Sequence, residues 1–550
     1  MIKPESWQPS DGIKLEPNAL LAAREIDRSL AVTAGPGAGK TELLAQHADF
    51  LLHSGACRYP QRILAISFKV DASRNLKDRV RQRCGFDLAS RLDSHTFHAF
   101  AKRLIDHFRL ILTGKDALDA DYTIGKPGVP RRQIEFDNMV PLAVQILKSS
   151  DIARNAVRQT YSHVFLDEFQ DCTAEQYRLI REAFFGTAVQ LTAVGDTKQR
   201  IMGWAGALEG VFQTFAADFD ARPLNLYQNF RSQPRLRRMQ NAMIKVMDPA
   251  AAVPNAELAG SGGSVEVLKF EDSQQEAEEL TDMIQGWIDD EGVAASEIAV
   301  LVSRQLEFYA DRLMAGLSER GIPFRNEQSL QDLSAEPAAR LIVDFLIVVA
   351  DDCKPDAYGR LMDVLLVTGI DEDTAYEQRA RWHRFIDSAR AQVRQGGQSA
   401  TLAVLQKFAG KFLELLGREA LAALSADYEH GARLEEVVAQ TYAHIAKLLG
   451  PEGDILKVLG RFSEDNAVRI MTIHKSKGLE FDSVVVLGVE KQTFWGKADE
   501  ERSAFFVAIS RAKRRLCLTV ADRRERPEGF NQRWDERRDP HQEFLKYRTA

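Results

Sequence analysis

The stretch Ala34-Gly-Pro-Gly-Ala-Gly-Lys-Thr41 decides the fold of this 550-residue chain. The apolar run Val32-Thr-Ala34 precedes it, and residues 41–52 follow it with apolar side chains at helical spacing. In this order of strand, glycine-rich loop and helix, backbone N–H groups can wrap a phosphate that the helix N-terminus also faces. The loop begins with alanine where the strict G-x-x-x-x-G-K-[ST] pattern has glycine, so an ordinary glycine-rich turn is the alternative.

The side chains at the end of this loop carry the chemistry. Lys40 would place a point charge at the β- and γ-phosphates of a nucleotide, and Thr41 would offer its hydroxyl to Mg²⁺. We expect the nucleotide to contact Gly35, Pro36, Gly37, Ala38, Gly39, Lys40, Thr41 and Glu42.

Further short apolar runs lie on both sides of a linker-like segment, Ala259-Gly-Ser-Gly-Gly-Ser264. Three precede it and end in or near polar residues, as parallel strands do when their carboxyl ends bind a ligand. Similar runs follow it, whereas residues 336–450 have an almost wholly helical pattern. We therefore predict an α/β fold with two parallel-sheet cores and a helical insertion in each. The first core takes residues 1–98 and 160–222 around an insertion at 99–159, and the second takes residues 223–335 and 451–550 around an insertion at 336–450.

Polar residues downstream suit hydrolysis of the bound nucleotide. Asp167 and Glu168 end an apolar strand, which fits a carboxylate for the metal followed by one that activates water. Gln199 follows another strand and could touch both water and γ-phosphate. Arg231 and Arg511 are candidate arginine fingers, which neutralise charge on the phosphate oxygens. Taken alone, an acidic pair of this kind is often merely solvated, and an arginine usually lies on the surface.

Bulk composition excludes several classes of protein. With 45% hydrophobic and 27% charged residues the chain is typical of globular proteins, and it has no apolar run near the ~20 residues that span a bilayer. The N-terminus has no secretory pattern. The five cysteines of the chain include no C-x-x-C pair, so we expect neither structural zinc nor a disulfide framework. We also expect a cytoplasmic location.

The net charge of −7 does not exclude nucleic acid, because a polyanion needs only a local basic track. Residues 69–83 and 231–238 are basic enough to supply one. Solvated helix faces are an equally good interpretation of either stretch.

Several motifs together resemble the UvrD/Rep family of superfamily 1 DNA helicases, from about Leu15 to Val520. They are Asp167-Glu-Phe-Gln-Asp171, Gly195-Asp-Thr-Lys-Gln-Arg-Ile-Met-Gly-Trp-Ala-Gly-Ala207, Thr472-Ile-His-Lys-Ser-Lys-Gly-Leu-Glu480 and Val507-Ala-Ile-Ser-Arg-Ala-Lys513. The alanine that leads the phosphate loop is usual in this family. The resemblance implies two RecA-like cores, ATP and Mg²⁺ as cofactors, and single-stranded or tailed duplex DNA as the partner.

Carried over position by position, the resemblance also implies site residues. The ATPase set would be Lys40, Thr41, Asp167, Glu168, Gln199, Arg231 and Arg511, with Phe230 stacking on adenine and Gly478 and Glu480 on the ribose side. The single-strand channel would be lined by Phe68, Thr96, Phe97, His98, Trp204 and His474. Aromatic stacking suits a motor that is indifferent to sequence, although core packing is the alternative for Phe68, Phe97 and Trp204.

The chain departs from the family pattern in three places. Ala19 stands where the family has its adenine-reading glutamine, and Met202 and Ala205 replace a tyrosine and an arginine. No spaced carboxylate–lysine cluster of a fused nuclease follows Lys513, so a separate nuclease or other effector could be a partner.

Three hypotheses follow. The first is an ATP-dependent translocase that unwinds DNA with 3′→5′ polarity in repair or defence against foreign DNA, the polarity resting on resemblance alone. The second is a DNA-sensing ATPase that regulates an effector without processive unwinding. The third, a phosphoryl-transferring kinase, is disfavoured because two distant arginines and Gln199 suit attack by water.

Overall fold

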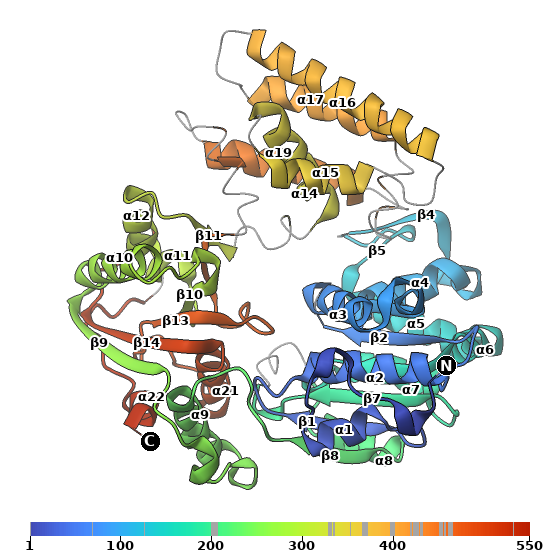
Figure 1. Cartoon of the computed structure of the whole chain (residues 1–550), viewed down its shortest axis with the longest axis horizontal. Coiled ribbons are helices and arrows are strands. Elements are labelled where there is room, and N and C mark those ends of the chain that lie inside the picture. Colours follow the sequence, from blue (N-terminus) through green and yellow to red (C-terminus); the bar gives the residue numbers. More distant parts are fainter. Residues whose placement is uncertain are drawn as a thin grey trace.

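The chain forms two α/β cores side by side, with a helical region beyond them (Figure 1). The computed structural model describes residues 2–68, 70–125, 127–199, 207–327, 333, 336–351, 354–365, 372–395, 402–417, 421, 428, 433–449, 455, 458–459, 466–527, 529–531 and 533–549. The N-terminus belongs to the first core and the C-terminus to the second.

The first core is a six-stranded parallel sheet in the order β3-β2-β6-β7-β1-β8. Its four central strands are mostly apolar and buried on both faces, as expected when helices cover both sides of a sheet, whereas the two edge strands are more polar and only partly buried. The strands are β1 (Leu30–Ala34), β2 (Arg62–Ser67), β3 (Leu92–Thr96), β6 (Tyr161–Leu166), β7 (Gln190–Gly195) and β8 (Arg222–Leu226). The sheet thus extends past residue 222, where we predicted its end, because β8 pairs with β1 before the chain leaves for the second core.

The helices of the first core are α1 (Pro17–Ala23), α2 (Lys40–Ser54), α3 (Val70–Ala89), α7 (Ala174–Phe184) and α8 (Val211–Asp218). Successive residues of β1 point to opposite faces of the sheet. Leu30 and Val32 accordingly pack in one apolar cluster, and Ala31 packs in another.

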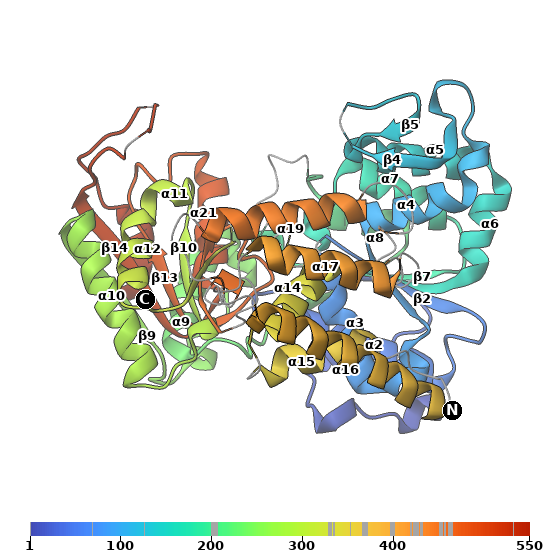
Figure 2. The same ribbon diagram turned by 90° about the horizontal axis from the view of Figure 1, so that it is seen from above.

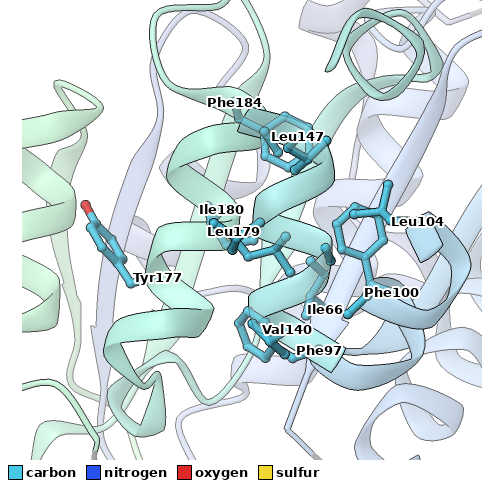
Figure 3. Packing of buried hydrophobic residues seen from close by; sticks show 14 of the residues in the cluster. Ile66, Phe97, Phe100, Leu104, Val140, Leu147, Tyr177, Leu179, Ile180 and Phe184 are labelled. Atoms are coloured by element: carbon cyan, nitrogen blue, oxygen red, sulfur yellow. The ribbon is translucent and has the colours of Figure 1, made fainter. Parts of the chain in front are cut away.

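The first insertion contains α4 (Phe97–Phe108), β4 (Leu118–Ile124), β5 (Arg131–Ile134), α5 (Met139–Ser149) and α6 (Asp151–Thr160). It is not purely helical, because β4 and β5 pair in a small sheet of their own. Its helices share an apolar cluster with the first core, in which Phe97 and Phe100 of α4 lie near Val140 of α5 and Ile66 of β2 (Figure 3). The insertion is therefore anchored on the sheet.

The second core is another six-stranded parallel sheet, in the order β11-β12-β10-β13-β14-β9. Val302 pairs with both Thr472 and Leu487, so β10, β12 and β13 end at one edge. The strands are β9 (Ser264–Asp272), β10 (Ile298–Val302), β11 (Phe324–Asn326), β12 (Val468–Thr472), β13 (Phe481–Leu487) and β14 (Ala512–Arg523). The helices are α9 (Pro234–Met247), α10 (Ser273–Asp289), α11 (Leu306–Tyr309), α12 (Asp311–Glu319), α21 (Ala498–Ile509) and α22 (Gln542–Lys546).

A helical region between β11 and β12 has its own apolar core. Its described helices, seen from above in Figure 2, are α14 (Pro337–Ala350), α15 (Pro355–Leu365), α16 (Glu372–Gln395), α17 (Leu402–Leu416) and α19 (Arg433–Leu449). Phe345 of α14 stacks on Phe412 of α17 with ring centroids 4.3 Å apart. Neither these helices nor any other described helix combines the length and apolarity needed to cross a membrane.

A buried ionic cluster attaches the C-terminal segment to the second core. The Arg524 guanidinium donates to Glu276 at 2.6 and 2.9 Å and to Glu490 at 2.9 and 3.0 Å, and all three side chains are almost fully buried. Arg538 approaches Glu490 at 3.8 Å. Such charges are costly to bury singly, so removing one partner is expected to be far more destabilising than replacing the whole cluster.

Candidate functional site

The phosphate loop connects the end of β1 to the start of α2, as the sequence predicts. Gly37 and Gly39 adopt φ of 69° and 76°, the left-handed region that glycine enters at little cost. A Cβ on Gly37 would lie 2.5 Å from Oδ1 of Asn229, and the N–H of Phe230 donates to the Gly37 carbonyl at 3.0 Å. The loop therefore lies directly against the segment that leads to the second core.

Lys40 points back over this loop. Its Nζ donates to the carbonyls of Ala34 and Gly35 at 3.3 and 3.2 Å. Burial lowers the pKa of Lys40, and the carboxylates of Glu168 and Asp196 act against that effect. The ammonium group thus lies among carboxylates at the sheet edge. Thr41 follows as the second residue of α2.

The acidic end of β6 lies next to the loop. Glu168 has a left-handed backbone, φ 52°, which is uncommon for a residue with a side chain and is typical of functional sites. Its carboxylate accepts from Nε2 of Gln170 at 2.6 Å, and Gln170 in turn accepts from the N–H of Asp196 at 2.9 Å. These bonds fix the direction of the Glu168 side chain.

The two adjacent carboxylates have opposite pKa shifts. Burial, followed by the like charge of Glu168, raises the pKa of Asp167. Burial would also raise the pKa of Glu168, but the ammonium groups of Lys477 and Lys40 outweigh it and hold that pKa below its ordinary range. A buried carboxylate beside a like charge is a group that a divalent cation stabilises, so Asp167 fits Mg²⁺, while Glu168 stays ionised as a base needs to be.

Of the two candidate arginines on the second core, Arg511 contacts the first core directly, whereas the side chain of Arg231 is held by other residues of the second core. Nη2 of Arg511 donates to Oε1 of Gln199 at 2.8 Å, and Nε2 of Gln199 donates to Asp196 at 2.8 Å. Arg231 donates from Nε to Glu480 at 2.7 Å and from Nη1 to the Ser510 carbonyl at 3.1 Å.

These arginines lie close to each other. Burial and then the neighbouring Arg231 lower the pKa of Arg511 to about 9. Arg231 also lowers the pKa of Lys40, so its charge acts on both of the other cations. Cations gathered in one partly buried site despite their repulsion fit a triphosphate.

Sequence reasoning missed Lys477, although it lies inside the motif at 472–480. Its ammonium group is buried, forms an ion pair with Asp171, donates to the Gln199 carbonyl at 2.9 Å and lies 3.8 Å from Glu168. The position of Lys477 within a motif was visible in the sequence, but its partners were not, because they are some 300 residues away in the chain.

A cavity of about 730 Å³ extends from the phosphate loop along the inter-core segment to α9. Phe230 borders it with 63% of its surface exposed, open for a base to stack on. Glu480 and Gly478 are exposed. Two other positions singled out in the sequence do not border this cavity. Ala19 is buried in the first core, and Glu42 turns toward α3, where it pairs with Arg83 at 2.9 Å and Arg79 at 3.2 Å.

On the expected DNA side, strand register brings some residues together. Phe68 follows β2 and Thr96 ends β3 at the same edge, since Ser67 pairs with Thr96. Thr96 also caps α4 by accepting from the N–H of Ala99 at 3.1 Å. His98 stacks on the half-exposed ring of Phe136, with centroids 3.9 Å apart.

The remaining residues of that set have other positions. Phe97 is only 2% exposed and packs edge-on against the partly buried Phe68, so it offers no free face for a base. His474 follows β12 in the second core. Trp204 lies outside the described residues.

Some of the arginines in the two basic stretches make internal contacts. In the first, Arg79 and Arg83 are paired with Glu42. In the second, Arg231 pairs with Glu480, and Arg238 donates to the carbonyls of Leu258 and Gly260. These arginines stabilise the fold, whereas Lys77, Arg81 and Arg235 are exposed, so both interpretations of the two stretches stay open.

Comparison with known proteins identifies the same family of helicases that the sequence motifs resemble. The UvrD/REP helicase N-terminal domain matches residues 15–111 and 116–220, and the UvrD-like helicase C-terminal domain matches residues 224–333 and 428–523. Among curated proteins, the chain is 22% identical to the ATP-dependent DNA helicase Rep of Escherichia coli K12, over 93% of this chain and 91% of Rep.

Two further relatives are DNA helicase II of the same organism, 24% identical over 90% of this chain and 83% of the relative, and the ATP-dependent DNA helicase PcrA of Leuconostoc citreum, 23% identical over 91% and 81%. The matches cover both cores and include every motif described above. The chain belongs to the UvrD/Rep family of superfamily 1 DNA helicases.

Proposed function

We propose that this chain is an ATP-driven single-strand DNA translocase that unwinds duplex DNA with 3′→5′ polarity. The observation that supports the proposal is the contact of the two cores beside the phosphate loop, through the Arg511–Gln199 hydrogen bond and the Lys477–Asp171 ion pair. A site built in this way closes around the nucleotide and opens after hydrolysis, which converts chemistry into motion of the cores.

Each residue has a distinct part in hydrolysis. Glu168 accepts a proton from the attacking water, and Gln199 orients that water. Lys40, Arg231 and Arg511 neutralise charge as it develops on the γ-phosphate oxygens. Thr41 and Asp167 would hold Mg²⁺, which supplies further neutralisation of the phosphates.

The loop after β12 links hydrolysis to DNA. His474, a proposed DNA contact, lies in this loop, and Lys477, three residues later, contacts Asp171 and the Gln199 carbonyl. DNA that shifts the loop would therefore shift contacts of the catalytic residues. Phe68, Thr96 and His98 are the proposed contacts from the first core.

Strand displacement tests the proposal. The purified chain, ATP, Mg²⁺ and a duplex with a 3′ tail should release the labelled strand, and a 5′-tailed or blunt duplex should not. Glu168→Gln should bind nucleotide and DNA but lose turnover by at least about 100-fold, because the base is gone. Full activity of this variant would show that the role of Glu168 is misassigned.

The same assay decides on the second candidate, a DNA-sensing ATPase that regulates an effector such as a nuclease. The presence of His474 and Lys477 in one loop suits sensing as well as translocation. ATPase activity stimulated by DNA without strand displacement would favour this candidate. A cytoplasmic location stays a prediction from the cysteine pattern.

A further inference from the structure

Trp495 is a large aromatic side chain that the second core presents to solvent. It lies in the loop between β13 and α21, and 69% of its surface is exposed. The preceding residue, Phe494, is buried against the rings of Phe505 and Phe544, with centroids 5.9 and 5.2 Å away. The loop is therefore anchored in the core directly before the residue that faces outward.

A second contact fixes the loop directly after Trp495. The N–H of Gly496 donates to Oε1 of Glu501 at 2.9 Å, and Glu501, buried on α21, forms an ion pair with Arg304. A Cβ on Gly496 would overlap that carboxylate oxygen and would lie 3.0 Å from Nη2 of Arg304. A side chain at this position would displace the ion pair, so the loop is built closely around it.

Arg304, which follows β10, holds the indole ring from one side. Its guanidinium carbon lies 4.3 Å from the centroid of the Trp495 ring, within the range of a cation–π interaction. Because Arg304 is itself fixed by its ion pair with Glu501, the orientation of the ring is restrained. One face of the indole is thus covered, and the exposed remainder is open to another planar group.

The loop lies at the edge of the second sheet that also carries His474, a proposed DNA contact. Val302 at the end of β10 pairs with Thr472 at the end of β12. His474 follows Thr472 by two residues and Arg304 follows Val302 by two, so both leave neighbouring strands at the same level. Adjacent strands are only about 4.8 Å apart. Trp495, which packs on Arg304, is therefore on the same side of the second core as His474.

We propose that Trp495 is a stacking platform for a base of single-stranded DNA on the second core. This rests on the function proposed above, since it adds a contact to the same DNA path. Stacking on an aromatic ring suits any base, because every base has a π-face. The exposed side chains that follow, Lys497, Asp499 and Glu500, are of mixed charge and do not form a basic track, so a base fits this position better than phosphates do.

The test measures binding of a labelled strand of about 16 thymidines to the full chain by fluorescence anisotropy, without nucleotide. Trp495→Ala should raise the Kd by about 5- to 100-fold, the value of one stacked base. Trp495→Phe, which keeps a ring, should stay within about threefold of the wild type. Tyr59→Ala removes another exposed ring, on the loop before β2 of the first core, and is the matched control that should leave the Kd unchanged.

An abasic strand of the same length separates stacking from a loss of structure. It keeps the phosphates but has no base to stack, so the wild type and Trp495→Ala should bind it equally. Equal Kd values for the thymidine strand, or a loss of the same size on both strands, would overturn the inference. DNA-stimulated ATP hydrolysis by the wild type would in that case leave the proposed function standing. A wild-type chain that binds neither strand would contradict the proposed function, and the inference with it.

Discussion

The guanidinium group of Arg511 donates a hydrogen bond to the amide oxygen of Gln199 at 2.8 Å, across the boundary between the two cores. The remaining donors of Arg511 bind the carbonyls of Val507 and Leu479 and the hydroxyl of Ser510. The side chain is therefore held rigidly by the second core while its tip reaches the first. An arginine fixed in this way can complete the site without first being ordered.

Arg511→Ala should lower kcat of the DNA-stimulated ATPase by about 10³-fold or more, the range of an arginine finger. Arg511→Lys should recover little, because a lysine cannot reproduce the four contacts. The measurement is steady-state hydrolysis at saturating DNA. Arg533→Ala, whose side chain is 87% exposed, is the control. Retention of kcat within about tenfold of wild type would remove Arg511 from the catalytic set.

The buried pair of Lys477 and Asp171 should behave as a unit. Lys477→Met leaves a buried carboxylate without its partner, at a cost of about 3–5 kcal/mol, and should lower both the melting temperature and the stimulation of ATPase by DNA. The double variant with Asp171→Asn should regain part of the stability, since no lone charge remains. Strictly additive losses in a double-mutant cycle would mean that the two residues are not coupled.

Phe68 and Phe97 pack edge-on against each other but should differ in function. Phe97→Ala should destabilise the fold by about 3–5 kcal/mol, because the ring is buried. Phe68→Ala should weaken binding of single-stranded DNA by about 1–3 kcal/mol, the value of one stacked base. Urea unfolding and fluorescence anisotropy measure the two effects. Unchanged DNA affinity in Phe68→Ala would assign that ring to the core as well.

The free energy of unfolding should decrease as the pH is lowered, because two histidines are buried in the first core. Burial lowers the pKa of His47 to about 4 and of His163 to about 3, from an ordinary value of 6.5. Between pH 6.5 and these values only the unfolded chain takes up the protons, so acid favours unfolding. Each histidine removes up to about 1.4 kcal/mol per pH unit, and the contribution is complete only above pH 6.5.

Urea unfolding at about pH 7 and about pH 5 measures this slope. His47→Gln should make the free energy of unfolding less dependent on pH. His107→Gln, at an exposed helix position, should leave the slope as it is. Equal slopes in wild type and His47→Gln would contradict the assignment.

Sequence patterns predicted the elements on which the site is built, because these depend on local order. Strand, loop and helix around Lys40 follow from apolar spacing and glycines, and the acidic end of β6 follows from one buried run. Two parallel sheets follow from repeated units of this kind. The prediction that Arg231 and Arg511 lie together at the phosphate loop depended on the motif resemblance, because the two residues are 280 positions apart in the sequence.

Long-range charge pairing could not be predicted in the same way. Glu42 follows the loop directly, yet its carboxylate turns to the arginines of α3. Residues 69–83 have a composition that would suit DNA, but two of their arginines are paired inside the protein. Pairing depends on which helix faces lie together, and that is decided by the packing of α2 on α3. The end of the first core was misplaced for a similar reason, because β8 joins a sheet begun nearly 200 residues earlier.

The Arg524 cluster makes the C-terminal segment a structural part of the second core. A chain shortened to end at Asp522 would leave two buried acidic side chains, Glu276 and Glu490, without the guanidinium group of Arg524. It would also remove Phe544 from its contact with the ring of Phe505 on α21, the helix that ends two residues before Arg511. Changes in the C-terminal segment would thus reach the proposed nucleotide site through α21.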